Sequence, residues 1–183
     1  MGVDEPREGT VRRGEVLTLA QRSLRRRDYQ LLRADQDLGL LRFAPGRRSV
    51  AKATTGQTGP LVLTAGPGGV EVRRHDGATV ATVERARRGA AVIRTAQGPP
   101  SSWRRSGRWH RWTIATGEAD LLHVTAAQGF VRSWARITAQ RDLPEQAAVL
   151  LGVIGGFLAL RELQAEVDAS AAVGGFVAAT GSG

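Results

Sequence analysis

The chain has 183 residues, of which 42% are hydrophobic, and a formal net charge of +9. This length and composition suit a single domain with a substantial core. The sequence contains no cysteine, which excludes a disulfide scaffold, a cysteine zinc site, a thiol nucleophile and a disulfide-linked partner. The 23 glycines and 7 prolines indicate many turns, and so favour a β-rich fold over a helical bundle.

The positive charge is distributed unevenly along the chain. Residues 142–183 contain one basic residue, Arg161, against five acidic ones, so that residues 1–141 carry a net charge of +13. Lys52 is the only lysine. Because arginine pairs bidentately with phosphate, the composition suggests a phosphate-bearing partner. The alternative is that the arginines only keep the surface solvated.

The N-terminal segment, residues 1–28, is expected to be mobile and basic. Its opening, MGVDEPREGT, is polar and partly acidic, unlike a secretory signal peptide, and residues 1–14 have the composition of a disordered segment. The first half of the next stretch, EVLTLAQRSLRRRDYQLLRAD, fits either a short basic helix or a strand. We expect a cytoplasmic protein.

From Tyr29 onward, short apolar segments alternate with turn signals, and we count ten candidate strands. Asp76-Gly77 is a strong hairpin turn, because such residues accept the positive φ that a tight turn requires. In VEVRR, residues 70–74, the valines share one face and the charged residues the other. This alternation indicates antiparallel strands with one buried face, in a barrel or a sandwich.

The stretch LPEQAAVLLGVIGGFLALREL, residues 143–163, predicts one helix, with Asp142 as its cap and Glu145 as the capping-box partner. Its charge-free part, residues 147–160, is shorter than the roughly 20 residues of a membrane-spanning helix. A core helix is therefore favoured over a tail anchor formed by these residues. A helix that is apolar on every face must be enclosed on every face, which predicts a closed antiparallel β-barrel around it.

Three glycines inside this helix need a packing reason, because each costs roughly 1 kcal/mol relative to alanine. Gly152 and Gly156 form a G-x-x-x-G pattern. This pattern brings transmembrane helices together, and the same spacing lets strands approach a helix closely.

In the order of its elements, the chain resembles the tubby C-terminal-like group, which includes phospholipid scramblases and LURP-one-related proteins. The resemblance covers residues 29–163 and rests on YQLLRADQDLGLLRF, VEVRRHDGATVATVER, FVRSWARIT and LPEQAAVLLGVIGGFLAL. It implies a mainly β fold, a closed antiparallel barrel around one C-terminal hydrophobic helix. Residues 164–183 are expected to form a small-residue tail.

The resemblance also implies a kind of partner. Tubby-type members bind phosphoinositide headgroups through basic residues, and scramblase-type members associate with membranes and have lipid movement attributed to them. No matching headgroup motif is visible, and the palmitoylated cysteines of scramblases are absent. Asp35 and Asp37 supply too few oxygens for calcium, which takes six or more. An anionic phospholipid at the inner membrane surface is the expected partner, and a protein partner is the alternative.

No motif for catalysis is present. The sequence has no G-x-S-x-G nucleophile elbow and no phosphate-cradling loop that leads into a helix. His75, His110 and His123 fit no zinc spacing. We therefore expect a protein that is not an enzyme and uses no cofactor or metal.

One segment, SSWRRSGRWHRW, interleaves tryptophans and arginines. This mixture suits the headgroup region of a membrane; it also suits single-stranded nucleic acid, a less favoured partner. Alternatively, the tryptophans close the barrel and the arginines stack on them. Alternation places Trp112 and Ile114 on one face, so at least one tryptophan is expected in the core. The candidate lipid- or anion-binding residues are Trp103, Arg104, Arg105, Arg108, Trp109, Arg111, Arg25, Arg26 and Arg27.

The sequence thus predicts a non-enzymatic scramblase/tubby-like barrel that binds an anionic phospholipid or another phosphate-bearing partner at a membrane surface. Two alternatives stay open: a structural or protein-interaction barrel without a lipid ligand, and a tail-anchored membrane protein.

Overall fold

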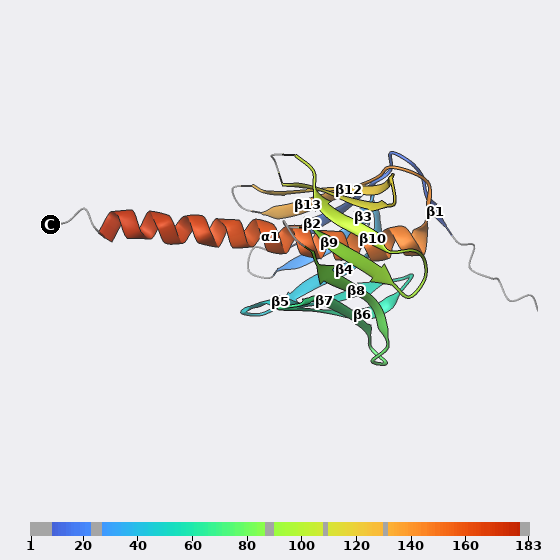
Figure 1. Ribbon diagram of the computed structural model, residues 1–183, viewed down its shortest axis with the longest axis horizontal. Coiled ribbons are helices and arrows are strands. Elements are labelled where there is room, and N and C mark those ends of the chain that lie inside the picture. Colours follow the sequence, from blue (N-terminus) through green and yellow to red (C-terminus); the bar gives the residue numbers. More distant parts are fainter. Residues whose placement is uncertain (1–8, 23–26, 87–89, 108–109, 130–131, 180–183) are drawn as a thin grey trace, which may run out of the picture.

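The computed structural model describes residues 9–22, 27–86, 90–107, 110–129 and 132–179, with backbone alone for 47–48 and 171–179. In these residues it has fourteen strands followed by one helix (Figure 1). The strands are β1 (Thr10–Val11), β2 (Val16–Gln21), β3 (Asp28–Arg33), β4 (Gln36–Ala44), β5 (Arg47–Thr55), β6 (Gly59–Gly66), β7 (Gly69–Arg74), β8 (Thr79–Arg85), β9 (Ala91–Thr95), β10 (Ser101–Arg105), β11 (Arg111–Thr116), β12 (Ala119–Gln128), β13 (Ser133–Ala139) and β14 (Leu143–Pro144). The helix is α1 (Glu145–Ala179).

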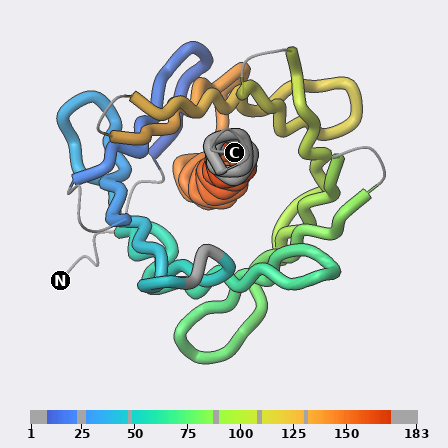
Figure 2. The backbone as a smooth tube through the Cα atoms, turned by 90° about the vertical axis from the view of Figure 1, so that its left-hand side faces the viewer, coloured from blue at the N-terminus to red at the C-terminus, as the bar shows by residue number. Residues whose placement is uncertain are grey.

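Twelve of the strands, β2 to β13, form one closed antiparallel barrel. Each strand pairs with its neighbours in the chain, and β13 pairs with β2 to close the ring (Figure 2). The short strands β1 and β14 pair with each other outside the barrel. The predicted fold class, a closed antiparallel barrel with one C-terminal helix inside, is confirmed.

Side-chain alternation determines which face of each strand lines the barrel interior. On β7, Val70 and Val72 are buried while Glu71 and Arg73 point away from the core. On β2, Leu17 and Leu19 are buried in the same way. Since side chains in a strand alternate between faces, each strand gives the interior an apolar row and leaves a polar row outside.

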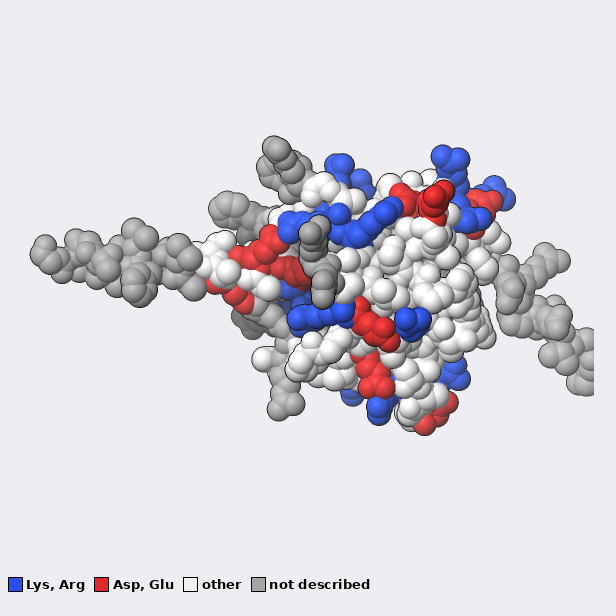
Figure 3. Space-filling model, viewed as in Figure 1, with Lys and Arg blue, Asp and Glu red and all other residues white. Residues whose placement is uncertain are grey.

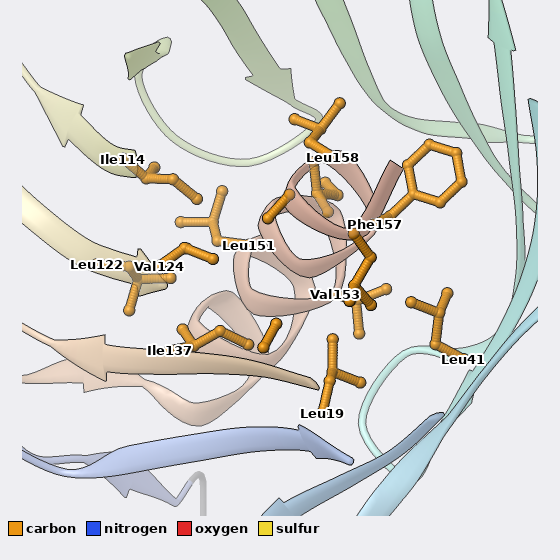
Figure 4. Packing of buried hydrophobic residues seen from close by; sticks show 14 of the residues in the cluster. Leu19, Leu41, Ile114, Leu122, Val124, Ile137, Leu151, Val153, Phe157 and Leu158 are labelled. Carbon is orange, nitrogen blue, oxygen red and sulfur yellow. The ribbon is translucent and has the colours of Figure 1, made fainter. Parts of the chain in front are cut away.

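The first half of α1 fills the barrel interior. All residues from 151 to 160 are buried, and the ring of Phe157 stacks on that of Phe43 with centroids 5.4 Å apart. Side chains from strands on several sides surround the helix (Figure 4). Complete burial of a Leu, Val or Phe side chain stabilises a fold by about 1.5–3 kcal/mol, so this helix is the centre of the core.

The helix lies off the barrel axis, close to β12 and β13 (Figure 2). The glycines of the G-x-x-x-G pattern allow this approach. A Cβ atom at Gly152 would stand 3.6 Å from side-chain atoms of Ile137 and Leu17, and one at Gly156 would overlap Leu19. The glycines thus bring strands β2 and β13 close to the helix, as the pattern suggested for a core helix.

The domain boundaries differ from those predicted. The barrel begins with β2, so part of the segment expected to be mobile and basic, residues 1–28, is a barrel strand paired with both β3 and β13. In the ambiguous stretch that begins at Glu15, residues Val16–Gln21 are therefore a strand. The helix also continues to Ala179, through most of the expected tail 164–183.

The start of the helix also differs from the prediction. Asp142 accepts a hydrogen bond from the backbone N–H of Arg13, at 2.7 Å, rather than capping α1. Residues 143–144 pair with β1, and the backbone N–H of Glu145 donates to the carbonyl of Gly9. The first turn is therefore held by the N-terminal segment, which the helix pattern alone could not indicate.

By length and composition alone, residues Glu145–Ser170 of α1 could cross a membrane, but 72% of the relevant window is buried inside the barrel. Residues 147–160, considered above as a tail anchor, lie within this enclosed part. In this fold they pack against strands.

Candidate functional site at the exit end of the barrel

The two ends of the barrel differ because α1 enters at one and leaves at the other. At the entry end, Arg33 bonds to Glu145 at the first residue of α1. At the exit end, strand residues contact Glu162 and Glu166, and α1 then projects beyond the barrel (Figure 1). The candidate site lies at the exit end.

Two tryptophans and one glutamate join the barrel wall to α1 at the exit end. The rings of Trp103 and Trp112 stack with centroids 5.7 Å apart and an interplanar angle of 12°. Nε1 of Trp112 donates to Oε2 of Glu162 at 2.9 Å, and Nε1 of Trp103 lies 3.4 Å from Oε1 of the same carboxylate. Both oxygens of Glu162 therefore face indole donors.

Strand register places these groups together. On β10, Ser101 and Trp103 face inward, and the next inward position, at the end of the strand, is Arg105. Trp103 pairs with Ile114 on β11, and Arg105 pairs with Trp112. The Arg105 guanidinium lies 6.0 Å from the centroid of Trp112 and 3.1 Å from Oε1 of Glu166. This cation is therefore matched by a carboxylate on the helix.

A cavity of about 440 Å³ lies beside the tryptophans, between α1 and strands β7 to β10. It occurs where the strands carry small or short side chains, including Gly69 and Ala91, and opposite the wall against which α1 packs. Val70, Val83 and Leu158 supply much of its apolar lining. The cavity is thus a hollow that opens at the exit end, with apolar side chains on the strands and with Arg85, Arg161 and Glu162 in its lining.

Two arginines, Arg85 on β8 and Arg161 on α1, line this cavity together with Glu162. Burial lowers the pKa of Arg161, the positive charge of Arg85 lowers it further, and Glu162 raises it. Arginine nevertheless stays protonated at neutral pH. Among the residues that the structure describes, neither Arg85 nor Arg161 forms a salt bridge with a carboxylate.

Arg27, Arg85 and Arg105 occupy equivalent positions at strand ends. Arg85 and Arg105 come two positions after the inward-facing Val83 and Trp103, and Arg27 comes two positions before the inward-facing Tyr29. Arg27 also lines a small hollow together with Arg161. We refer to Arg27, Arg85, Arg105 and Arg161 as the exit ring.

The acidic side chains at this end lie mainly on the helix. Figure 3 shows them gathered where α1 leaves the barrel, with basic side chains beside them on the barrel end. Glu162 and Glu166 are among these acids, and both are engaged by strand residues. Among the described residues, the positive charges at this end that form no salt bridge with Glu162 or Glu166 include those of Arg85, on a strand, and Arg161, on the helix.

The structure separates the residues of the Trp/Arg segment into two groups. Trp103 is 1% exposed, so its indole closes the barrel, as the alternative interpretation proposed, and does not reach solvent. Trp112 is buried as well, which confirms that a tryptophan of this segment is in the core. Arg104 points outward and pairs with Asp120 at 3.0 Å, and Arg111 is exposed on the outer face of β11.

Of the other candidates, Arg27 and Arg105 belong to the exit ring. Arg25, Arg26, Arg108 and Trp109 lie outside the described residues. The structure thus brings Trp103, Arg27 and Arg105 to the exit end, and places Arg104 and Arg111 on the outer wall.

Three residues of the site were missed by the sequence analysis: Arg85, Arg161 and Glu162. A signal for the first existed, because Arg85 continues the inward alternation of Ala81 and Val83. A signal for Arg161 also existed, because it is the one basic residue after residue 141 and it stands directly at the end of the apolar run. The sequence analysis instead favoured the Trp/Arg segment as the binding site, because arginines are most closely spaced there.

The arrangement can bind an anion. It offers guanidinium donors next to an apolar cavity, and among the described residues no cluster of three or more His, Cys, Asp or Glu side chains could hold a metal ion. His123 bonds to Asp120 at 3.0 Å on the outer wall, away from the exit ring.

The fold defines the chain as a closed β-barrel with a central C-terminal helix. No protein-family model matches the chain, and neither the curated proteins nor the solved structures contain a match to it.

Proposed function

We propose that this protein is a non-enzymatic barrel of the tubby C-terminal-like and scramblase-like kind, which binds an anionic phospholipid or another phosphate-bearing partner at a membrane surface. The exit ring is the binding surface. The barrel around a single C-terminal helix is the arrangement that the sequence resemblance implies, and it supports this assignment.

One observation carries the proposal: Arg85 and Arg161 flank the exit of the helix without a carboxylate partner among the described residues. An arginine that only solvates a surface faces outward, as Arg111 does. Arg85 instead continues an inward row, and Arg161 is partly buried. Arg161 is partly desolvated, whereas Arg85 is exposed beside it. Guanidinium groups without a paired carboxylate are favourable sites for phosphate, because they form strong charge-assisted hydrogen bonds with it.

The entry end provides a contrast. There Arg33 bonds to Glu15 at 2.7 Å and to Glu145 at 3.0 Å, so its charge is satisfied within the protein. Charge at the exit end remains available to a partner. The barrel is therefore expected to meet the membrane with its exit end.

Vesicle co-sedimentation tests this proposal. At physiological salt, the protein should pellet with vesicles that contain phosphatidylserine or a phosphoinositide and stay in solution with pure phosphatidylcholine. The double variant Arg85→Gln/Arg161→Gln should bind anionic vesicles roughly 30-fold more weakly, since a basic residue near such a surface contributes about 1 kcal/mol.

The matched control is Arg73→Gln/Arg94→Gln, which removes the same charge from outer-wall arginines paired with Glu71 and Glu84. It should retain most of the binding. Equal recovery of the unmodified protein with neutral and anionic vesicles would sink the proposal. A stoichiometric protein partner from the native cell, without vesicle binding, would favour the alternative of an interaction barrel.

A further inference from the structure

We propose that the cavity between α1 and strands β7 to β10 binds the hydrocarbon chain of one long-chain carboxylate, whose head group lies between Arg85 and Arg161. This inference rests on the proposed function in one respect, namely that Arg85 and Arg161 bind an anion. It adds a specific ligand and an internal site, which can be occupied without a membrane.

The size and lining of the cavity suit an apolar chain. Its volume of about 440 Å³ falls within the range of roughly 300–1,000 Å³ typical of small-molecule sites. Val70, Val83, Ala91 and Leu158 line it, and each is only 3–7% exposed to solvent. Aliphatic walls accept apolar molecules, so a hydrocarbon chain is the matching occupant for this part of the lining.

The fold keeps this space open. Gly152 and Gly156 allow α1 to pack against β2 and β13, on the far side of the helix from the cavity. On the cavity side, the Trp103 ring is fixed by its stack on Trp112 and by Glu162. It forms a rigid wall, which cannot move into the hollow without losing these contacts.

The charge at the opening selects the head group. Arg85 and Arg161 contribute two positive charges and Glu162 one negative charge, which leaves a net charge of +1. A carboxylate carries a single negative charge and accepts hydrogen bonds from guanidinium groups in a fork geometry. Both oxygens of Glu162 already face indole N–H groups, so Glu162 does not neutralise either arginine by a salt bridge.

Other ligand classes fit this cavity less well. A neutral hydrocarbon would leave Arg161 partly desolvated without a counter-ion, which is unfavourable. A nucleotide needs polar groups around its base and sugar as well as its phosphates, whereas the polar side chains of this lining are limited to Arg85, Arg161 and Glu162. A long-chain carboxylate uses both the charged opening and the apolar interior.

Titration with parinaric acid, a fluorescent long-chain fatty acid, tests the proposal on the full chain. Trp103 lines the cavity, so bound probe should quench tryptophan emission by energy transfer. Ala91→Leu adds volume to the cavity wall, and Arg85→Gln/Arg161→Gln removes the head-group partners. Each change should raise the Kd for the probe roughly tenfold or more, whereas Arg73→Gln/Arg94→Gln should leave it unchanged.

Competition by four compounds defines the chemistry of the site. Unlabelled oleate should displace the probe; acetate and inorganic phosphate at the same concentration should not, because they lack the chain. Displacement by a cationic amphiphile as effective as oleate would overturn the head-group assignment. Absence of probe binding, or equal binding by the Ala91→Leu variant with an unchanged thermal transition, would overturn the cavity site.

The two proposals can fail separately. Probe binding that is lost in Ala91→Leu, together with equal pelleting on neutral and anionic vesicles, would support the cavity site and refute the membrane role. Vesicle binding that depends on Arg85 and Arg161, with no parinaric acid bound, would support the membrane role and refute the cavity site.

Discussion

Nε1 of Trp112 donates a 2.9 Å hydrogen bond to Oε2 of Glu162, and so ties a strand of the barrel to the helix at its exit. Trp103 donates to the other oxygen of the same carboxylate. Three elements, β10, β11 and α1, thus meet at one side chain. This contact fixes the helix in the position that leaves the cavity beside it.

Replacement of Glu162 by alanine should destabilise the protein by about 2 kcal/mol, because both indole N–H groups lose a charged acceptor in a partly buried site. Urea unfolding followed by tryptophan fluorescence measures this change. The control is Glu118→Ala, at an exposed turn residue, which should alter stability by less than about 0.5 kcal/mol. Similar effects of the two variants would show that the Trp–Glu cluster contributes nothing specific.

The two glycines of the G-x-x-x-G pattern should respond oppositely to the same substitution. Gly152→Ala places a methyl group in ordinary contact with Ile137 and Leu17, so the better helix propensity of alanine should stabilise the fold by up to about 1 kcal/mol. Gly156→Ala forces its methyl group against the fully buried Leu19. Such overpacking typically costs about 1–3 kcal/mol.

Thermal or urea denaturation of both glycine variants is the measurement. Stabilisation by Gly156→Ala would contradict the close approach of α1 to β2. Destabilisation of similar size by both variants would show that helix backbone flexibility, and not the neighbouring strand, determines the effect.

The ion-pair cluster at the entry end should make stability depend on acid. Hydrogen bonds from Arg33, and then from the backbone of Arg12, lower the pKa of Glu15 below its usual 4.5. Since the pKa is lower in the folded state, this stabilisation is present above pH 4.5 and is lost as the pH falls through the folded value.

The variant Arg33→Gln tests this pH dependence. It should be less stable than the unmodified protein at neutral pH, and the difference should shrink as the pH falls below about 4. Urea midpoints measured from neutral to acidic pH give the comparison. A difference that is constant over this range would mean that Arg33 acts through packing and not through the charge of Glu15.

The fold class could be predicted because the alternating strand patterns and the apolar helix both indicated a closed antiparallel barrel. Alternation such as that of Val70 and Val72 marked the strands, and a helix apolar on all sides required a closed wall. The boundaries could not be predicted in the same way. Pairing of β2 with β13 joins segments far apart in the chain, and Arg25 to Arg27 made that region resemble a mobile segment.

The site was predicted only in part, because charge density does not show which face of a strand an arginine occupies. Arg104 and Arg105 are adjacent, yet one pairs with Asp120 outside and the other with Glu166 at the exit. The position of Arg161 directly after the apolar run is visible in the sequence, but it does not show which strand the side chain faces. Its placement beside Arg85 follows from the packing of the helix inside the barrel.

The orientation of the barrel on a membrane is the central claim, and the absence of cysteine allows it to be measured directly. Gly68→Cys introduces a labelling site in the turn between β6 and β7, at the exit end, where a Cβ atom has open space. Glu118→Cys does the same in the turn between β11 and β12, at the entry end. Each single variant can carry one environment-sensitive fluorophore.

On vesicles that contain phosphatidylserine or a phosphoinositide, the label at position 68 should shift to the blue and the label at position 118 should not. Neither label should respond to neutral phosphatidylcholine vesicles. A blue shift at position 118 alone, or the same shift at both positions, would contradict the account, because the exit ring would then not be the surface that meets the lipid.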